Sequence, residues 1–271
     1  MSNNPYIILE IKKLSRNFGG LKAVADFNLI LMPNELVGLI GPNGAGKTTV
    51  FNLITGMYKP TSGSIKFLGK EITNLKPHQI AQLGIARTFQ NIRLFSSLSV
   101  LDNVRIAYSH KINYGVFDSL VHSPKFNIGE KIIREKSMAV LEILGLAHRA
   151  SEIARNLPYG EQRKLEIARA LVSEPKLLLL DEPGAGMNPK EIIDLMELIS
   201  FIHEKFNLTI FLIEHQMRVV MGICERVIVM DFGEIISEGN PDEIQNDPAV
   251  IEAYLGSERK CIESEEVEDV A

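Results

Sequence analysis

Residues 41–48 read Gly-Pro-Asn-Gly-Ala-Gly-Lys-Thr and match in full the phosphate-binding pattern G-x-x-x-x-G-K-[ST]. An apolar run at 36–40 predicts a strand that leads into this loop, and residues 48–54 predict a helix that leaves it. In such a unit, small residues let successive backbone N–H groups point at phosphate oxygens, and the helix presents its positive N-terminal end to the same charge. The stretch predicts a nucleoside triphosphate site; the alternative is a glycine-rich turn that fits the pattern by chance.

The side chains of this phosphate loop also have expected roles. Lys47 has the length to reach the β- and γ-phosphates, and the hydroxyl of Thr48 is suited to ligate Mg²⁺. The nucleotide-binding residues expected from the pattern are Gly41, Pro42, Asn43, Gly44, Ala45, Gly46, Lys47, Thr48 and Thr49.

A second motif lies at residues 177–182, where four leucines are followed by Asp181 and Glu182. A buried strand of this kind delivers its polar end to the ligand-binding edge of a parallel sheet. Asp181 is then expected to hold Mg²⁺, and Glu182 to polarise the water that attacks the γ-phosphate. Alone, an apolar run before two acids would be read as a helix cap; together with the phosphate loop it favours hydrolysis.

Composition and charge narrow the class of protein. The chain has 271 residues, 45% hydrophobic and 23% charged, as in an ordinary soluble globular protein with one large domain or a core and a smaller subdomain. A net charge of −5 argues against nucleic-acid binding. Two cysteines, Cys224 and Cys261, suggest a reducing compartment. No signal-peptide pattern and no run of about 20 apolar residues is present. We therefore expect a cytoplasmic chain that meets a membrane through partners.

The apolar pattern divides the chain into three stretches. Strands at 6–14 and 23–32 flank a turn at 19–20, and a turn at 60–63 precedes a strand at 64–68. The middle has helices at 100–108, 131–144 and 162–171, with an irregular aromatic segment at 114–126. Then come a strand at 177–180, a helix at 189–204, a strand at 208–213, and a hairpin of 226–230 and 234–237 that turns at 231–233. Interleaved strands and helices indicate an α/β fold with a parallel sheet covered on both faces.

Together with these two motifs, further segments resemble the ATP-binding cassette (ABC) ATPases over nearly the whole chain. Gln90, in Arg-Thr-Phe-Gln at 87–90, matches the Q-loop glutamine of that family. Leu-Pro-Tyr-Gly-Glu-Gln at 157–162 occupies the signature position, and Gly-Ala-Gly-Met-Asn at 184–188 matches the D-loop. His215 matches the switch histidine, and Phe18 lies where the family stacks an aromatic ring on adenine. Taken singly, these residues would be ordinary surface or core residues.

The resemblance implies a P-loop NTPase (RecA-like) core with an antiparallel β subdomain and an α-helical signature subdomain. It implies one ABC ATPase domain at 1–256, in which 1–90 and 165–256 form the β layer and the core, and about 91–164 form the helical subdomain. Residues 257–271 are acidic and are expected to be a solvated tail.

The same resemblance implies ATP and Mg²⁺ as cofactors and assigns roles to residues. Catalytic roles would fall to Lys47, Gln90, Glu182 and His215, and metal binding to Thr48, Gln90 and Asp181. The signature residues Tyr159, Gly160, Glu161 and Gln162 would face the γ-phosphate of an ATP bound to a second cassette, and the D-loop residues are Gly186, Met187 and Asn188. One copy of each motif implies a dimer that closes over two ATPs. Departures from the usual signature are Pro158, Tyr159 and Glu161, and Asn188 stands where the family has aspartate.

The segments 157–162, 186–189, 213–217 and 250–256 resemble those of the ATP-binding subunits of branched-chain amino acid importers. The aromatic insertion near residues 108–128 resembles that of the larger of their two ATPases. The resemblance implies two membrane permeases docked near residues 90–130, an external solute-binding protein and a sister ATPase, with the chain peripheral on the cytoplasmic face of the inner membrane. Other cargoes stay open, including urea, short amides and lipopolysaccharide export. A soluble ABC protein acting on ribosomes or DNA, or a P-loop kinase, are more distant alternatives.

Overall fold

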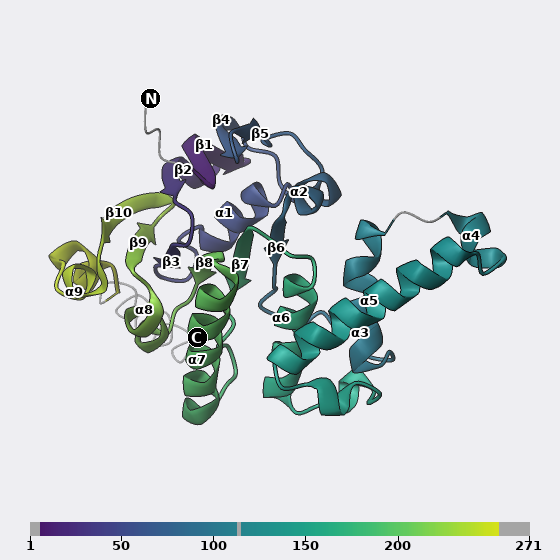
Figure 1. Ribbon diagram of the computed structural model, residues 1–271. Coiled ribbons are helices and arrows are strands. Elements are labelled where there is room, and N and C mark those ends of the chain that lie inside the picture. The colour runs from purple at the N-terminus through teal and green to yellow at the C-terminus, as the bar shows by residue number, and fades with distance from the viewer. Residues whose placement is uncertain (1–5, 113–114, 255–271) are drawn as a thin grey trace, which may run out of the picture.

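The structure is a computed structural model that describes residues 6–112 and 115–254, and within them the chain forms two sheets in layers (Figure 1). The larger sheet has the strand order β10-β9-β3-β8-β7-β6. All of its neighbouring strands pair in parallel except β10, which is antiparallel to β9 at one edge. The bounds are β3 Leu36–Ile40, β6 Ile85–Arg87, β7 Leu177–Asp181, β8 Thr209–Ile213, β9 Arg226–Asp231 and β10 Glu234–Gly239. The predicted α/β class is confirmed.

The central strands β3, β7 and β8 are buried along their whole length. On β7, Leu178 and Leu180 belong to the core on one face of the sheet, and Leu177 and Leu179 belong to the core on the other face. Because successive side chains of a strand point to opposite faces, a sheet covered on both sides needs an unbroken apolar run. The four leucines before Asp181 meet that need.

The smaller sheet is antiparallel, in the order β2-β1-β4-β5, with β1 Leu9–Phe18, β2 Leu21–Leu31, β4 Ser62–Phe67 and β5 Lys70–Glu71. The turn at 19–20 is confirmed, although the first strand begins at Leu9 rather than at residue 6. The turn predicted at 60–63 is wrong in its second half, because β4 already includes Ser62 and Gly63. At Gly63 (φ 91°) an added Cβ would lie 2.3 Å from the carbonyl oxygen of Lys13, so this glycine permits a close strand approach.

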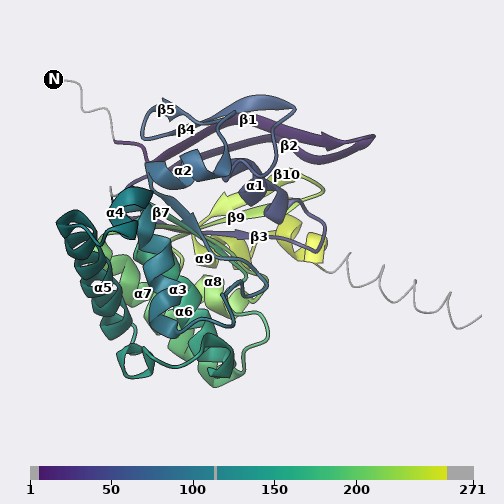
Figure 2. The same cartoon turned by 90° about the vertical axis from the view of Figure 1, so that its right-hand side faces the viewer.

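Helices cover both faces of the larger sheet. Helix α1 (Lys47–Ile54) lies between the two sheets, with α2 (Pro77–Leu83) beside it (Figure 2). The opposite face is covered by α6 (Tyr159–Leu171), α7 (Pro189–Phe206) and α8 (Met217–Ile223). Helix α9 (Pro241–Gln245) follows β10. The two layers that flank the sheet explain why its central strands are dry.

The helices α3 (Val100–Tyr108), α4 (Val116–Leu120) and α5 (Pro124–Ile143) gather with α6 on one side of the molecule, to the right in Figure 1. The helix predicted at 131–144 is longer than expected. It begins at Pro124 because the hydroxyl of Ser123 accepts a hydrogen bond from the amide of Phe126 (3.3 Å) and proline suits the first helical position. The segment predicted as irregular therefore contains α4 and the start of α5.

The acidic tail predicted at 257–271, with Cys261 in it, lies outside the described residues. Cys224 is a buried free thiol. In the part of the chain that the structure describes, no helix is both long and apolar enough to span a bilayer.

Candidate functional site

The segments singled out in the sequence meet at the carboxyl edge of the larger sheet. The phosphate loop follows β3, Gln90 follows β6, Glu182 follows β7 and His215 follows β8. The strand ends are aligned, since Asp181 pairs with Ile213 on the next strand. This edge is the usual ligand crevice of a parallel α/β sheet. Residues more than a hundred positions apart are thereby brought to one place.

The phosphate loop depends on glycine at two close approaches. At Gly41 (φ 149°) an added Cβ would lie 2.0 Å from the carbonyl oxygen of Met230, and at Gly46 (φ 103°) it would lie 2.4 Å from that of Ala23. Gly46 is the N-cap of α1, which starts at Lys47. The loop is therefore pressed against β2 and β9 and leads directly into a helix N-terminus, the geometry that suits a polyphosphate.

The side chain of Lys47 folds back onto the phosphate loop. Its Nζ donates hydrogen bonds to the carbonyl oxygens of Gly41 (2.7 Å) and Pro42 (2.9 Å), and the residue is only 6% exposed. Burial lowers the pKa of Lys47, while the carboxylates of Glu182 and Asp181 act in the opposite direction. A cation held at the loop in this way can take phosphate oxygens in place of the carbonyls.

Two of the predicted catalytic side chains, those of Gln90 and His215, meet at a third, Glu182. The amide Nε2 of Gln90 donates a hydrogen bond of 2.7 Å to Glu182 Oε2, and Nδ1 of His215 lies 3.6 Å from the same oxygen. The backbone amide of Glu182 donates to the carbonyl of Ile213 (2.9 Å), and its φ of 46° is in the left-handed region. An uncommon backbone conformation thus turns this carboxylate toward Gln90 and His215.

Asp181 has a partner that sequence reasoning missed. Arg87 at the end of β6 forms a salt bridge of 2.7 Å with Asp181 Oδ2, and both side chains are nearly buried. Arg87 also donates to Oδ1 of Asn52 in α1 (2.7 Å) and to Oγ1 of Thr55, the C-cap of that helix (3.3 Å). The guanidinium therefore joins β6, β7 and α1 under the site. The sequence signal for this role is the position of Arg87, a charged residue at the end of a short parallel strand.

The expected metal-binding side chains suit Mg²⁺ in their chemistry. Thr48 offers an exposed hydroxyl, Asp181 its second carboxylate oxygen, and Gln90 the oxygen of an amide whose nitrogen is already used on Glu182. Hydroxyl, carboxylate and amide oxygens are the hard ligands that Mg²⁺ takes, usually with substrate phosphates and water. The donor set fits the ion.

A second missed residue is Glu214, whose side chain is fully buried beside the switch histidine. Glu214 Oε1 accepts a hydrogen bond of 2.7 Å from the amide of Gly184, and the Nε2 of Gln216 donates to the carbonyl of the same glycine (3.2 Å). Burial raises the pKa of Glu214, while the Gly184 amide lowers it. The residues on both sides of His215 therefore hold the start of the D-loop. The sequence signal for Glu214 is its position directly after β8, which resembles that of Asp181 at the end of β7.

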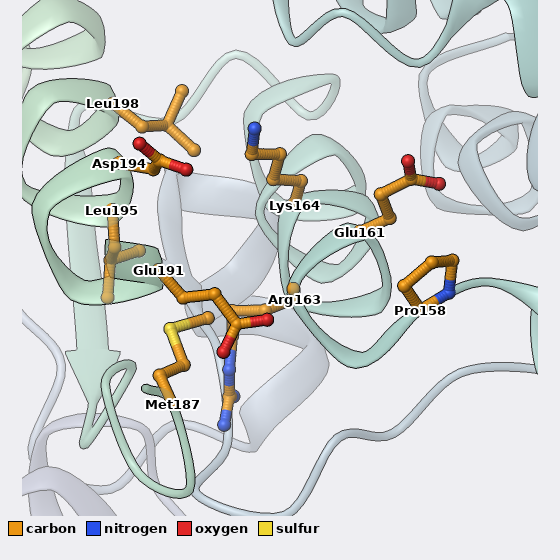
Figure 3. A pocket seen from close by; sticks show the side chains of 10 residues that line it. Pro158, Glu161, Arg163, Lys164, Met187, Glu191, Asp194, Leu195 and Leu198 are labelled. Atoms are coloured by element: carbon orange, nitrogen blue, oxygen red, sulfur yellow. The ribbon is translucent and has the colours of Figure 1, made fainter. Parts of the chain in front are cut away.

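The signature segment is the N-terminus of α6. Pro158 is the N-cap and has no side-chain acceptor, so the amides that follow Tyr159 are not capped by it. The charge of Glu161 is balanced locally, because Arg149 Nε lies 3.0 Å from Glu161 Oε2. Figure 3 shows the pocket between α6 and α7, where Lys164 and Asp194 project from the two helices. At about 170 Å³ it is smaller than ordinary ligand pockets.

In the D-loop, Asn188 has a local structural role. Its Oδ1 accepts hydrogen bonds of 3.0 Å from the amides of Lys190 and Glu191, and Glu191 Oε2 accepts one of 3.0 Å from the amide of Asn188. This is a capping box at the start of α7. Asparagine and aspartate cap equally well, so the departure from the family residue keeps the helix start. Gly186 (φ 76°) and Met187 precede the cap.

Phe18 ends β1 and is 39% exposed. Its ring meets that of Tyr58 edge-on (centroids 5.3 Å apart), and the guanidinium of Arg16 lies 4.6 Å from its centroid. Ala23, on the strand paired with β1, touches the phosphate loop at Gly46. Phe18 therefore lies on the strand pair that borders the phosphate loop, and Tyr58 reaches it from the segment after α1.

Fold and site together define the nucleotide-binding cassette of an ABC transporter. Residues 24–185 match the family model described as ABC transporter, and residues 234–260 match that of the branched-chain amino acid ATP-binding cassette transporter. The chain belongs to the ABC transporter family.

Named relatives are similar over nearly their full length. The chain is 47% identical over 249 residues to the high-affinity branched-chain amino acid transport ATP-binding protein LivG of Escherichia coli K12, covering 92% of this chain and 98% of the relative. It is 44% identical to the high-affinity branched-chain amino acid transport ATP-binding protein BraF of Pseudomonas aeruginosa, again covering 92% of this chain and 98% of the relative. Among solved structures, an ATP-binding cassette of an ABC transporter in its ADP conformation superimposes with a TM-score of 0.80 at 32% identity, covering 92% of this chain and 99% of that chain.

Proposed function

We propose that this chain binds ATP on residues 41–49, hydrolyses it with Glu182 as general base, and uses the cycle to energise import of branched-chain amino acids. The observation that carries the proposal is the convergence on Glu182 Oε2 of the Gln90 amide at 2.7 Å and the His215 imidazole at 3.6 Å. A carboxylate so held at the ligand edge of the sheet, next to the phosphate loop, suits activation of an attacking water.

In this mechanism Glu182 accepts a proton from water as the water oxygen bonds to the γ-phosphorus and the bond to the β–γ bridging oxygen breaks. Lys47 leaves the carbonyls of Gly41 and Pro42 for the phosphates and offsets their negative charge. His215 supplies a hydrogen bond to the γ-phosphate. Gln90 keeps the hydrogen bond from its amide nitrogen to Glu182, which leaves its amide oxygen as the atom that would contribute to a metal site.

Thr48, Gln90 and Asp181 would hold Mg²⁺, which when bound neutralises phosphate charge and orients the leaving group. Phe18 would stack on the adenine ring. These roles give every segment at the sheet edge a place in one reaction.

The active unit would contain two cassettes, because the signature segment is a helix N-terminus without a side-chain cap, which has the chemistry of an anion site, and the chain resembles cassettes that pair in this way. The backbone of residues 159–162 at the N-terminus of α6 would meet the γ-phosphate of the ATP on the second chain. The second chain is another copy or a sister ATPase. Closure by ATP and opening after hydrolysis is a two-state change driven by a ligand.

Within each chain we propose that 1–90 and 165–256 form the β layer and the nucleotide-binding core, and about 91–164 a helical subdomain; residues 1–5, 113–114 and 255–256 of these ranges lie outside the described residues. Two membrane permeases would dock near residues 90–130, with the chain on the cytoplasmic face of the membrane and a solute-binding protein on the other side. The similarity to LivG and BraF supports branched-chain amino acids as cargo.

The experiment is to isolate the native membrane complex and measure its ATPase rate with candidate solutes and the binding protein. Leucine, isoleucine and valine should stimulate hydrolysis. Stimulation by urea or a short amide, with none by leucine, would move the chain to another cargo; copurification with ribosomes in place of membranes would overturn transport altogether.

A further inference from the structure

Arg163, on the second turn of α6, is fully buried and grips the backbone of the Q-loop. Its Nη1 donates to the carbonyl oxygen of Phe89 (2.7 Å) and its Nη2 to that of Gln90 (2.8 Å). These two carbonyls flank the peptide that carries the Gln90 side chain. The signature helix therefore fixes the position of the backbone that carries the Gln90 side chain.

Glu166, one turn further along α6, completes the grip. It pairs with Arg163 Nη1 at 2.7 Å, and its other oxygen accepts from the amides of Phe89 (3.3 Å) and Arg93 (3.4 Å). The carboxylate is 4% exposed; burial raises its pKa, and Arg163 opposes that change. A buried ion pair is costly unless its remaining donors and acceptors are bonded. Here the Q-loop backbone supplies those bonds, so pair and loop stabilise each other.

Tyr159 extends this network to the D-loop. Its hydroxyl donates to the carbonyl oxygen of Ala185 at 2.9 Å and lies 3.4 Å from Arg163 Nη2. Ala185 is three residues after Glu182, and the side chain of Gln90 returns to Glu182 Oε2. Glu182, Gln90, Arg163, Tyr159 and Ala185 thus form a closed ring through the Q-loop, the signature helix and the D-loop of one chain.

We infer that Tyr159 and Arg163 are positioning residues that orient the Glu182 carboxylate from within the same chain. The hydroxyl of Tyr159 is committed to the D-loop of its own chain, so its side chain acts in cis, while the backbone of the signature segment stays available to the second chain. Arg163 is inaccessible to solvent and acts through its contacts with the Q-loop backbone, Glu166 and Tyr159. The inference rests on the proposed hydrolytic role of Glu182.

Tyr159→Phe removes one hydroxyl and leaves the ring, so the fold should be kept. Because it loses the hydrogen bond to the Ala185 carbonyl and the longer one from Arg163, we expect kcat of the full-length chain to fall by about three- to tenfold. The KM for ATP should change by less than twofold. In a Glu182→Gln background, the ATP concentration needed for dimerisation should be the same with Tyr159 or Phe. Arg163→Lys should lower kcat further, because an ammonium lacks the fork that reaches both carbonyls.

The double variant should be no slower than Arg163→Lys alone, since residues of one network are not additive. Matched controls are Tyr6→Phe and Arg134→Lys, whose side chains are exposed and away from the ring; both should keep the parent rate. If Arg163→Lys fails to fold, Tyr159→Phe decides alone. An unchanged kcat for Tyr159→Phe, or a higher ATP requirement for dimerisation, overturns the inference. A parent chain that does not hydrolyse ATP would instead reject the proposed function.

Discussion

Gln90 Nε2 donates a 2.7 Å hydrogen bond to Glu182 Oε2, which joins a residue that follows β6 to one that follows β7 across 92 positions of sequence. The Q-loop and the carboxylate proposed as general base are therefore linked directly within the protein, without a bound phosphate. A change that displaces the loop therefore displaces the carboxylate as well.

Glu182→Gln should bind ATP and form ATP-dependent dimers but hydrolyse very slowly. A positioned general base contributes about 10²- to 10⁴-fold, and an amide cannot accept the proton of the attacking water. Steady-state phosphate release, together with size-exclusion chromatography with and without ATP, measures both properties. Turnover within a few fold of the parent would show that another group activates the water.

Arg87→Met should destabilise the fold, because it leaves the carboxylate of Asp181 buried without its cation. Breaking a buried ion pair from one side costs about 3–5 kcal/mol, and urea unfolding measures it. The matched control is Arg105→Met, since Arg105 pairs with Asp102 and Glu130 at a partly exposed site where such pairs are worth about 0–1 kcal/mol. Equal losses for the two variants would argue against a special role of the Arg87–Asp181 pair.

ATP affinity should fall at alkaline pH through Lys47. Burial lowers the pKa of Lys47 in the protein without ATP, and a bound triphosphate would raise that pKa again. The site then binds a proton together with ATP, so binding is at full strength below the lowered pKa and weakens as pH rises through it. Titration calorimetry in two buffers of different ionisation heat measures the proton uptake. A Lys47→Met variant should show none, and uptake that persists in that variant would assign the effect to another group.

Asn188→Ala should lower the free energy of unfolding by about 1 kcal/mol, whereas Asn188→Asp should leave it nearly unchanged, because alanine has no acceptor for the first amides of α7 and aspartate has one. Chemical denaturation of both variants measures the difference. If alanine and aspartate behaved alike, capping would not explain the asparagine at this D-loop position.

Several elements could be predicted because each is specified by a short local pattern. The strand 36–40, the leucine run and the helix at 100–108 are continuous apolar or periodic segments whose burial does not depend on a distant choice. The predicted start of α5 is wrong because apolar spacing indicates a helix only from Lys131, whereas Ser123 and Pro124 are the helix-start signal.

Arg163 and Glu166 could not be distinguished from solvated residues in the sequence. Helix α6 also carries Lys164 and Arg169, and the sequence alone does not show which of its charged residues are buried in an ion pair and which are exposed. Their partners lie more than seventy residues away, at Phe89 and Gln90. Only the folded chain brings those backbone groups to α6, so burial of these charges is a tertiary property.

The most direct test of the account is leucine uptake by the complex of this chain with its permeases and partner ATPase, reconstituted in vesicles with the binding protein and Mg-ATP. With the parent chain, leucine should accumulate as phosphate is released; with Glu182→Gln, ATP should bind while accumulation and phosphate release both stop. Accumulation that continues with Glu182→Gln, or a parent complex that accumulates urea and not leucine, would contradict the account.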